Sequence, residues 1–73
     1  MKLTKWYFWE YDFECALVDE DGNVLLSGDY YHDKIDSKID GFVLALEHLG
    51  LKPIVSTKED DGCFDDWKVN QNK

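Results

Sequence analysis

"WYFWEYDFECALVDEDG", residues 6–22, decides how this chain folds. From Phe8 onward, apolar and acidic side chains alternate with the period of two that is typical of a β-strand. One face of such a strand carries Trp9, Tyr11, Phe13, Cys15 and Leu17. The other face carries Glu10, Asp12 and Glu14, with Trp6 and Phe8 at the end of the acidic row. The stretch therefore predicts one strand over residues 5–19, with an apolar face for the core and an acidic face that folding alone does not explain.

The length and the charge of the chain limit its class. Seventy-three residues predict a single domain, 1–73, with a modest core, and we expect residues 70–73 to fray. Sixteen acidic against eight basic side chains give a formal charge of −8. This charge disfavours direct binding of nucleic acid or of an anionic membrane, because both require Lys and Arg. It favours a basic protein surface as the partner, with solubility alone as the simpler explanation.

Targeting signals and cysteines give little information about the function of the chain. The sequence has no apolar run of membrane-spanning length, and its aromatic and acidic N-terminal region is unlike a signal peptide, so we expect a cytoplasmic protein. Two cysteines are too few for a disulfide framework. Cys15 lies on the apolar face, where it is expected to act as a small core side chain.

The second strand is predicted over residues 24–32, after the turn "DEDGN" at 19–23. Asp19 and Gly22 suit a type I turn with a glycine bulge, whereas Asp21-Gly22 alone suits a two-residue turn. The two turns differ by one residue in register, which exchanges the faces of the strand. The two-residue turn is preferred because it places Asp29 beside Glu14, not opposite an aromatic residue in the core.

The helix is predicted over residues 35–50, with Ser37 as N-cap, Gly50 just past its end and Pro53 preventing continuation. Its expected buried stripe is Ile39, Phe42, Leu46 and Leu49, flanked by Val43 and Ala45. "PIVST", 53–57, is a short third strand, and "CFDDWKV", 63–69, is a fourth strand in one of two alternatives. The fold class is thus α+β, with an antiparallel sheet of three to four strands and one helix across one face, ββαβ or ββαββ.

Metal and catalytic chemistry find weak support. "DEDGN" resembles the start of an EF-hand loop, but Gly22 falls at the fourth position and Tyr30 at the twelfth. The acids of "EDDGCFDD" have no spacing that fixes a coordination geometry, and no Cys-x-x-Cys pair exists for zinc. Carboxylates on an exposed strand also lack a pocket that would raise a pKa. We therefore expect a non-enzymatic protein without cofactor or metal.

The acidic row has a spacing of interest. Side chains two residues apart on a strand stand about 7 Å apart, which is close to the repeat of phosphates along a nucleic acid strand. In the preferred register Asp29 lies opposite Glu14, and like charges in that position are destabilising. Trp6, Phe8 and Tyr31 would supply the apolar anchors that a protein interface needs. The row is thus explained either by a basic groove on a partner or by a solvated strand face.

"YDFECALVDEDG" (11–22), a tyrosine-bearing strand and a short helix that carries a Phe together resemble the small inhibitors of uracil-DNA glycosylase encoded by Bacillus phages. The resemblance covers about residues 11–49. It implies an acidic protein with a three-stranded sheet and one helix, which dimerises and mimics DNA in the groove of the enzyme. It also implies that a helical Phe beside acids grips the enzyme, and Asp40-Gly41-Phe42 is the nearest match.

The expected function is therefore that of an acidic DNA-mimic protein which blocks the nucleic-acid-binding site of a host or phage enzyme. The residues expected to bind the partner are Trp6, Phe8, Glu10, Asp12, Glu14, Asp29, Tyr31, Asp40 and Phe42. The alternative is a small assembly domain that forms a homodimer or docks through its aromatic end, with acids for solubility only.

Overall fold

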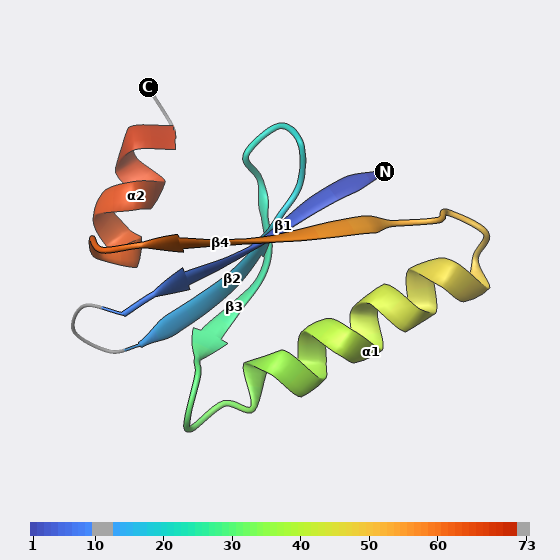
Figure 1. Cartoon of the computed structure of the whole chain (residues 1–73), viewed down its shortest axis with the longest axis horizontal. Coiled ribbons are helices and arrows are strands. Elements are labelled where there is room, and N and C mark those ends of the chain that lie inside the picture. Colours follow the sequence, from blue (N-terminus) through green and yellow to red (C-terminus); the bar gives the residue numbers. More distant parts are fainter. Residues whose placement is uncertain (10–12, 72–73) are drawn as a thin grey trace.

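The computed structural model of the chain describes residues 1–9 and 13–71, with side chains as far as residue 69. In chain order the elements are β1 (Lys2–Phe8), β2 (Glu14–Val18), β3 (Val24–Asp29), α1 (Ile35–His48), β4 (Ile54–Asp60) and α2 (Phe64–Gln71). The four strands form one sheet in the order β3-β2-β1-β4, and α1 packs on β2 and β3 (Figure 1). The expected α+β class, the count of three to four strands and a helix across one face are confirmed.

The single strand expected over residues 5–19 is wrong, because the chain reverses within it. β1 and β2 are antiparallel, and Phe8 pairs with Glu14 while Trp6 pairs with Ala16. Phe13, just before β2, has a left-handed φ of 51°. The alternation of side chains runs on through the reversal, so a period of two could not reveal it. Glu10, Tyr11 and Asp12 lie outside the described residues, and so does most of the expected acidic row.

The β2–β3 hairpin has one of the two turns considered for it, together with the strand register expected from the other. The Gly22 N–H donates to the Asp19 carbonyl (3.2 Å) with Gly22 at a φ of 86°, which makes the three-residue turn with a glycine bulge. Val18 accordingly pairs with Val24. A second irregularity between Leu17 and Val18 shifts the register by one residue, so Glu14 pairs with Asp29 after all. The preferred turn was wrong, but the register predicted for the rest of the hairpin is confirmed.

Helix α1 begins at Ile35, the first residue of the predicted range, and not after Ser37. Its N-cap is Lys34, in a left-handed conformation without a side-chain cap, so the assignment of Ser37 as N-cap is wrong. The end is as expected. Gly50, at a φ of 82°, donates to the Glu47 carbonyl (3.0 Å), and Leu51 donates to the Leu46 carbonyl (3.1 Å). These two bonds close a Schellman motif, for which glycine is favoured because it adopts positive φ without steric cost.

The buried stripe of α1 is shifted toward its N-terminus. Ile35 and Ile39 are fully buried, and Phe42, Val43 and Leu46 are partly buried against the core. Leu49 is 74% exposed and Ala45 is exposed, so both were wrongly placed in the stripe or its flank. The reason is that the C-terminal turn of α1 reaches away from β2 and β3, the strands on which the helix packs (Figure 1).

The C-terminal third differs most from expectation. β4 runs on to Asp60 and pairs with β1 in parallel, from Lys2 opposite Ile54 to Phe8 opposite Asp60, so the sheet is mixed and not wholly antiparallel. The alternative fourth strand at 63–69 is wrong, since that segment forms α2. Asp65 and Asp66 in its first turn suit the positive end of the helix dipole.

A helix packs on each face of the sheet, and each face has its own core. On the α1 side the buried side chains are Leu3, Cys15, Leu17, Ile35 and Ile39. On the α2 side they are Phe8, Ala16, Val18 and Phe64, with Trp6 and Trp67 partly buried against them. Trp6, Phe8 and Glu14 do share a face, but Phe64 and Trp67 of α2 pack against Trp6 and Phe8 there. Phe8 is only 1% exposed, so its expected place on an open acidic surface is wrong.

Candidate protein-binding site

Five aromatic side chains form a continuous group where β1 ends and β2 begins. They are Tyr7, Trp9, Phe13, Tyr30 and Tyr31, and we refer to them as the aromatic end cluster. Tyr7 and Trp9 stack with ring centroids 5.1 Å apart, and Tyr30 meets both rings edge-on at 5.8 and 5.6 Å. Tyr31 completes the group, at 5.0 Å from Tyr30 and 5.5 Å from Phe13. Edge-on and stacked contacts of this kind are favourable for aromatic pairs.

The outer part of the cluster faces solvent. The exposed fraction is 65% for Tyr31 and 40% for Phe13, whereas Tyr7, Trp9 and Tyr30 are half-buried beneath them. The φ of 51° at Phe13 is rare for a bulky residue and costs about 1–3 kcal/mol. The N–H of Tyr30 donates to the Phe13 carbonyl (2.9 Å) and helps to hold this conformation. Two apolar rings are thus fixed in place on a supporting aromatic layer, which is the arrangement of an interface anchor.

Carboxylates surround the same end of the sheet. Glu14 lies opposite Asp29 in the β2–β3 register. Asp29 Oδ1 accepts the backbone N–H groups of Tyr31 (2.9 Å) and His32 (2.8 Å), and Asp33 Oδ2 accepts that of Asp29 (2.8 Å). These bonds fix Asp29 and Asp33 relative to the rings. The site therefore combines rigid apolar rings with rigid negative charge.

Gly28 allows this arrangement. A Cβ at position 28 would lie 3.0 Å from Oδ2 of Asp33, the oxygen that accepts the Asp29 N–H. With a larger residue at position 28, the Asp33 side chain would have to shift by a few tenths of an ångström. Gly28 pairs with Cys15 on the α1 side of the sheet.

A polar link anchors the base of the cluster to α1. The hydroxyl of Tyr7 donates to Asp36 Oδ1 (3.0 Å), and Nζ of Lys5 lies 3.4 Å from the same oxygen. Burial raises the pKa of Tyr7, and its hydrogen bond to Asp36 adds to the effect. Burial disfavours the ammonium of Lys5, but Tyr7 and Asp36 outweigh it and raise its pKa. The link holds Tyr7 in place and joins β1 to the first turn of α1.

The structure separates the residues that the sequence grouped as one site. Tyr31, Glu14 and Asp29 lie at the aromatic end of the sheet. Trp6 and Phe8 share a sheet face with Glu14, which pairs with Phe8, but they pack in the core against α2. Phe42 is partly buried on the α1-side core, and Asp40 is exposed on α1. Glu10 and Asp12 lie outside the described residues.

Sequence reasoning missed four members of the cluster, Tyr7, Trp9, Phe13 and Tyr30. A signal for three of them was present. Tyr7 and Trp9 are two residues apart and so share a face, and the predicted register placed Tyr30 on the apolar face as well. Phe13 was expected in the core, and its left-handed conformation, which turns it to the surface, has no signature in the sequence.

Metal and thiol sites are a separate question. Among residues 1–9 and 13–71, no three His, Cys, Asp or Glu side chains gather in a way that could hold a metal ion. The Asp19 carboxylate accepts the backbone and side-chain N–H groups of Asn23 and the N–H of Asp21, bonds which lower the pKa of Asp19 and commit it to the turn. Both cysteines are free thiols. Burial raises the pKa of Cys15 to about 11, so this thiol is a poor nucleophile at neutral pH.

Comparison of the chain with protein-family models, with curated proteins and with solved structures finds no match. None of the described helices is long and apolar enough to cross a membrane. The site must therefore be interpreted from its own geometry.

Proposed function

We propose that this chain is an acidic, non-enzymatic binding protein whose aromatic end docks on a basic surface, such as the groove in which an enzyme holds nucleic acid. One observation carries the proposal: the exposed rings of Phe13 and Tyr31 lie at the same end of the sheet as the opposed carboxylate residues Glu14 and Asp29. Aromatic anchors ringed by charge are typical of protein interfaces. The mechanism would be competitive, with carboxylates in the places of phosphates and a ring in a pocket.

The charge of the whole chain supports this choice of partner. A formal charge of −8 would speed the encounter with a basic surface and oppose binding of nucleic acid itself. The resemblance to phage inhibitors of uracil-DNA glycosylase makes that enzyme the first target to test. The described chain has four strands and two helices, where the resemblance implies three strands and one helix, so the target stays a prediction.

The test is an inhibition assay with uracil-DNA glycosylase and a uracil-containing oligonucleotide. Competitive inhibition would raise the KM for DNA at unchanged kcat, and it would weaken as salt is added. A variant with glutamine at positions 10, 12 and 14 should fold and should inhibit less, mainly through slower association. Tyr31→Ala should weaken inhibition while leaving stability within about 0.5 kcal/mol. A wild-type protein that leaves both the glycosylase and a basic nuclease fully active would contradict the proposal.

The second candidate, a small assembly domain, is favoured by a different observation. Leu44, Leu49 and Ile54 are large apolar side chains that are more than half exposed. Self-association through them or through the aromatic end would be measured by sedimentation equilibrium of the free protein. A stable homodimer that Tyr31→Ala dissociates, with no effect on any nucleic-acid enzyme, would favour this candidate over the inhibitor.

A further inference from the structure

The outer edge of the sheet on the β4 side pairs with no described strand. β4 is the last strand in the order β3-β2-β1-β4, and six of its seven residues are exposed. The N–H of Ile54 points inward, because it donates to the Met1 carbonyl (2.8 Å). Successive residues of a strand turn their N–H and C=O groups to alternate sides. Val55, Thr57 and Glu59 therefore present their backbone donors and acceptors to solvent.

A groove runs alongside this edge on the α1 side of the sheet. It has a volume of about 360 Å³ and is lined by Ile39, Asp40, Val43, Leu44, Glu47 and Val55. It exists because α1 packs on β2 and β3 and leaves the neighbouring face of β4 uncovered. Leu44 remains 55% exposed and Val55 37% exposed. The floor of the groove is thus apolar surface that the fold itself does not bury.

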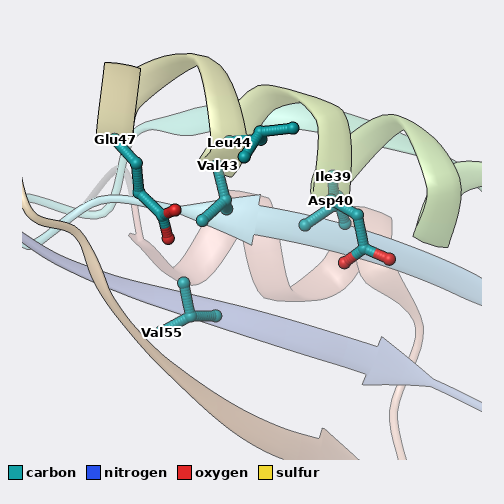
Figure 2. A pocket seen from close by; sticks show the side chains of 6 residues that line it. All are labelled: Ile39, Asp40, Val43, Leu44, Glu47 and Val55. Carbon is teal, nitrogen blue, oxygen red and sulfur yellow. The ribbon is translucent and has the colours of Figure 1, made fainter. Parts of the chain in front are cut away.

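Two carboxylates line the groove. Figure 2 shows the side chains of Asp40 and Glu47 hanging from α1 toward the sheet, with Val55 rising from β4 below them. Neither carboxylate has a hydrogen bond or an ion pair with any described residue. No Lys or Arg stands three or four residues away from either of them on the helix. Glu59 adds a third acid on the same sheet face, since it pairs with Tyr7.

We propose that the β4 edge and this groove bind an extended segment of another protein that carries two basic side chains around an apolar one. The segment would add as a fifth strand to β4, with main-chain hydrogen bonds to Val55, Thr57 and Glu59. Alternate side chains would then point into the groove. The surface is distinct from the aromatic end cluster, so the proposal goes beyond the function proposed above and does not depend on it.

The spacing of the carboxylates sets the pattern of the segment. Asp40 and Glu47 are seven residues apart on one helix, which is about 10.5 Å. Side chains four residues apart on a strand are about 13 Å apart and share a face. Flexible lysine or arginine side chains can close the difference. The groove therefore fits the pattern basic-x-apolar-x-basic, with the apolar side chain against Leu44 and Val55.

Charge favours this occupant over a second copy of the chain. Two copies would bring together two formal charges of −8. A second β4 would offer Glu59 and Asp60 against one cation, Lys58, whose ammonium lies over the Trp6 ring at 5.6 Å on the other side of the sheet. Nothing on a second β4 would meet Asp40 and Glu47 with opposite charge.

The experiment titrates the labelled full chain with a capped peptide of sequence TKTVTKT and follows backbone amides by NMR. We expect saturable shifts, and slowed hydrogen exchange, at the amides of Val55, Thr57 and Glu59. The inward amides of Ile54, Ser56 and Lys58 should change little. The peptide TETVTET has the same apolar residue and opposite charge, and it should not bind. Equal binding of both peptides, or shifts confined to the aromatic end cluster, would overturn the proposal.

Two pairs of variants separate binding from folding. Thr57→Pro removes one outward N–H and blocks strand addition, while Thr57→Val changes only the side chain. We expect the proline variant to lose TKTVTKT binding and the valine variant to keep it. Asp40→Asn with Glu47→Gln should raise the Kd about tenfold, since two charge contacts together are worth on the order of 1.4 kcal/mol. Asp61→Asn with Asp66→Asn, a matched loss of charge elsewhere, should raise it much less.

Each remaining outcome is decisive. If the Thr57→Pro variant does not fold, the variant with Asp40→Asn and Glu47→Gln tests the proposal instead. Asp40 and Glu47 are both exposed, so their replacement leaves the core intact. If the two charge variants weaken peptide binding equally, only the net charge attracts the peptide, and the proposal that the groove binds it is refuted. Concentration-dependent dimerisation of the free chain that Thr57→Pro abolishes would make a second copy the occupant and would also overturn the proposal.

Discussion

The packing of helix α2 on the sheet is tested most directly by the substitution Phe64→Ala. Phe64 is 4% exposed and lies in the core on the α2 side of the sheet. Its ring centroid is 5.1 Å from that of Phe8 and 6.1 Å from that of Trp67. Truncation would remove the ring that joins the helix to the sheet and would leave Phe8 facing a cavity.

The expected loss is large compared with the whole stability. A buried Phe→Ala change costs about 3–5 kcal/mol. A domain of 73 residues has a free energy of unfolding of roughly 4–11 kcal/mol, at about 0.05–0.15 kcal/mol per residue. Phe64→Ala should therefore remove roughly a quarter or more of the stability and should lower the urea midpoint in proportion. The measurement is urea unfolding followed by far-UV circular dichroism and by the fluorescence of Trp6 and Trp67.

Val69→Ala on the same helix is the matched control. Val69 is 61% exposed, so its truncation should change the free energy of unfolding by no more than about 0.5 kcal/mol. If Phe64→Ala also costs less than about 1 kcal/mol, α2 does not cover the sheet. Phe8 and Trp6 would then be surface residues, and the two-core description would be refuted.

Three further predictions concern glycines, a thiol and the strained ring. Gly41→Ala should stabilise the protein by about 0.5–1 kcal/mol, because alanine is the better residue inside a helix. Gly50→Ala should destabilise it by about 1 kcal/mol, because Gly50 has a φ of 82°. A Cβ meets no atom within 4 Å at either position, so thermal unfolding of the two variants compares the backbone effects alone. The folded state holds the Cys15 proton up to a pKa of about 11, while the unfolded chain releases it near 9, so the free energy of unfolding should fall between those pH values by roughly 2–3 kcal/mol. Urea unfolding at pH 8 and pH 10.5 would check this, and an unchanged free energy would contradict the burial of the thiol. Phe13→Gly should relieve the left-handed strain and leave stability equal or higher, yet weaken partner binding in the inhibition assay; a large destabilisation would show that the ring belongs to the core.

Local features such as the end of a helix and the register of a hairpin could be predicted from the sequence. The packing of the helices on the two faces of the sheet could not. Gly50 marked the end of α1 because only its conformational freedom closes that motif, and Asp29 was placed opposite Glu14 because hydrophobic faces must match across a hairpin. The reversal between β1 and β2 was not detectable from the sequence, since a strand pair that keeps the same alternation on both sides leaves the pattern intact. Phe8 was misplaced for a related reason, because the apolar residues of "CFDDWKV" show too little helical periodicity to predict the helix that buries it.

The aromatic end cluster shows the same limit. Its inner rings follow from alternation and register, so they could have been found in the sequence. Its outer rings depend on the conformation of Phe13 and on the turn after β3, where Asp29 binds the backbone of Tyr31 and His32. The groove beside β4 depends on where α1 crosses the sheet, and no local pattern determines that position.

The two compensating irregularities of the β2–β3 hairpin affect how this sequence can change over time. The three-residue turn alone would invert the faces of β3, and the irregularity between Leu17 and Val18 inverts them back by leaving Leu25 outside the regular pairing. Deletion of one of the adjacent leucines, Leu25 or Leu26, would then shorten the chain without moving Gly28 or Asp29 to the wrong side. In most proteins, insertions and deletions are tolerated in the loops that connect strands and not within the strands. In this hairpin β3 itself tolerates the deletion of one residue, so a shorter chain would keep the same arrangement of charges and aromatic rings.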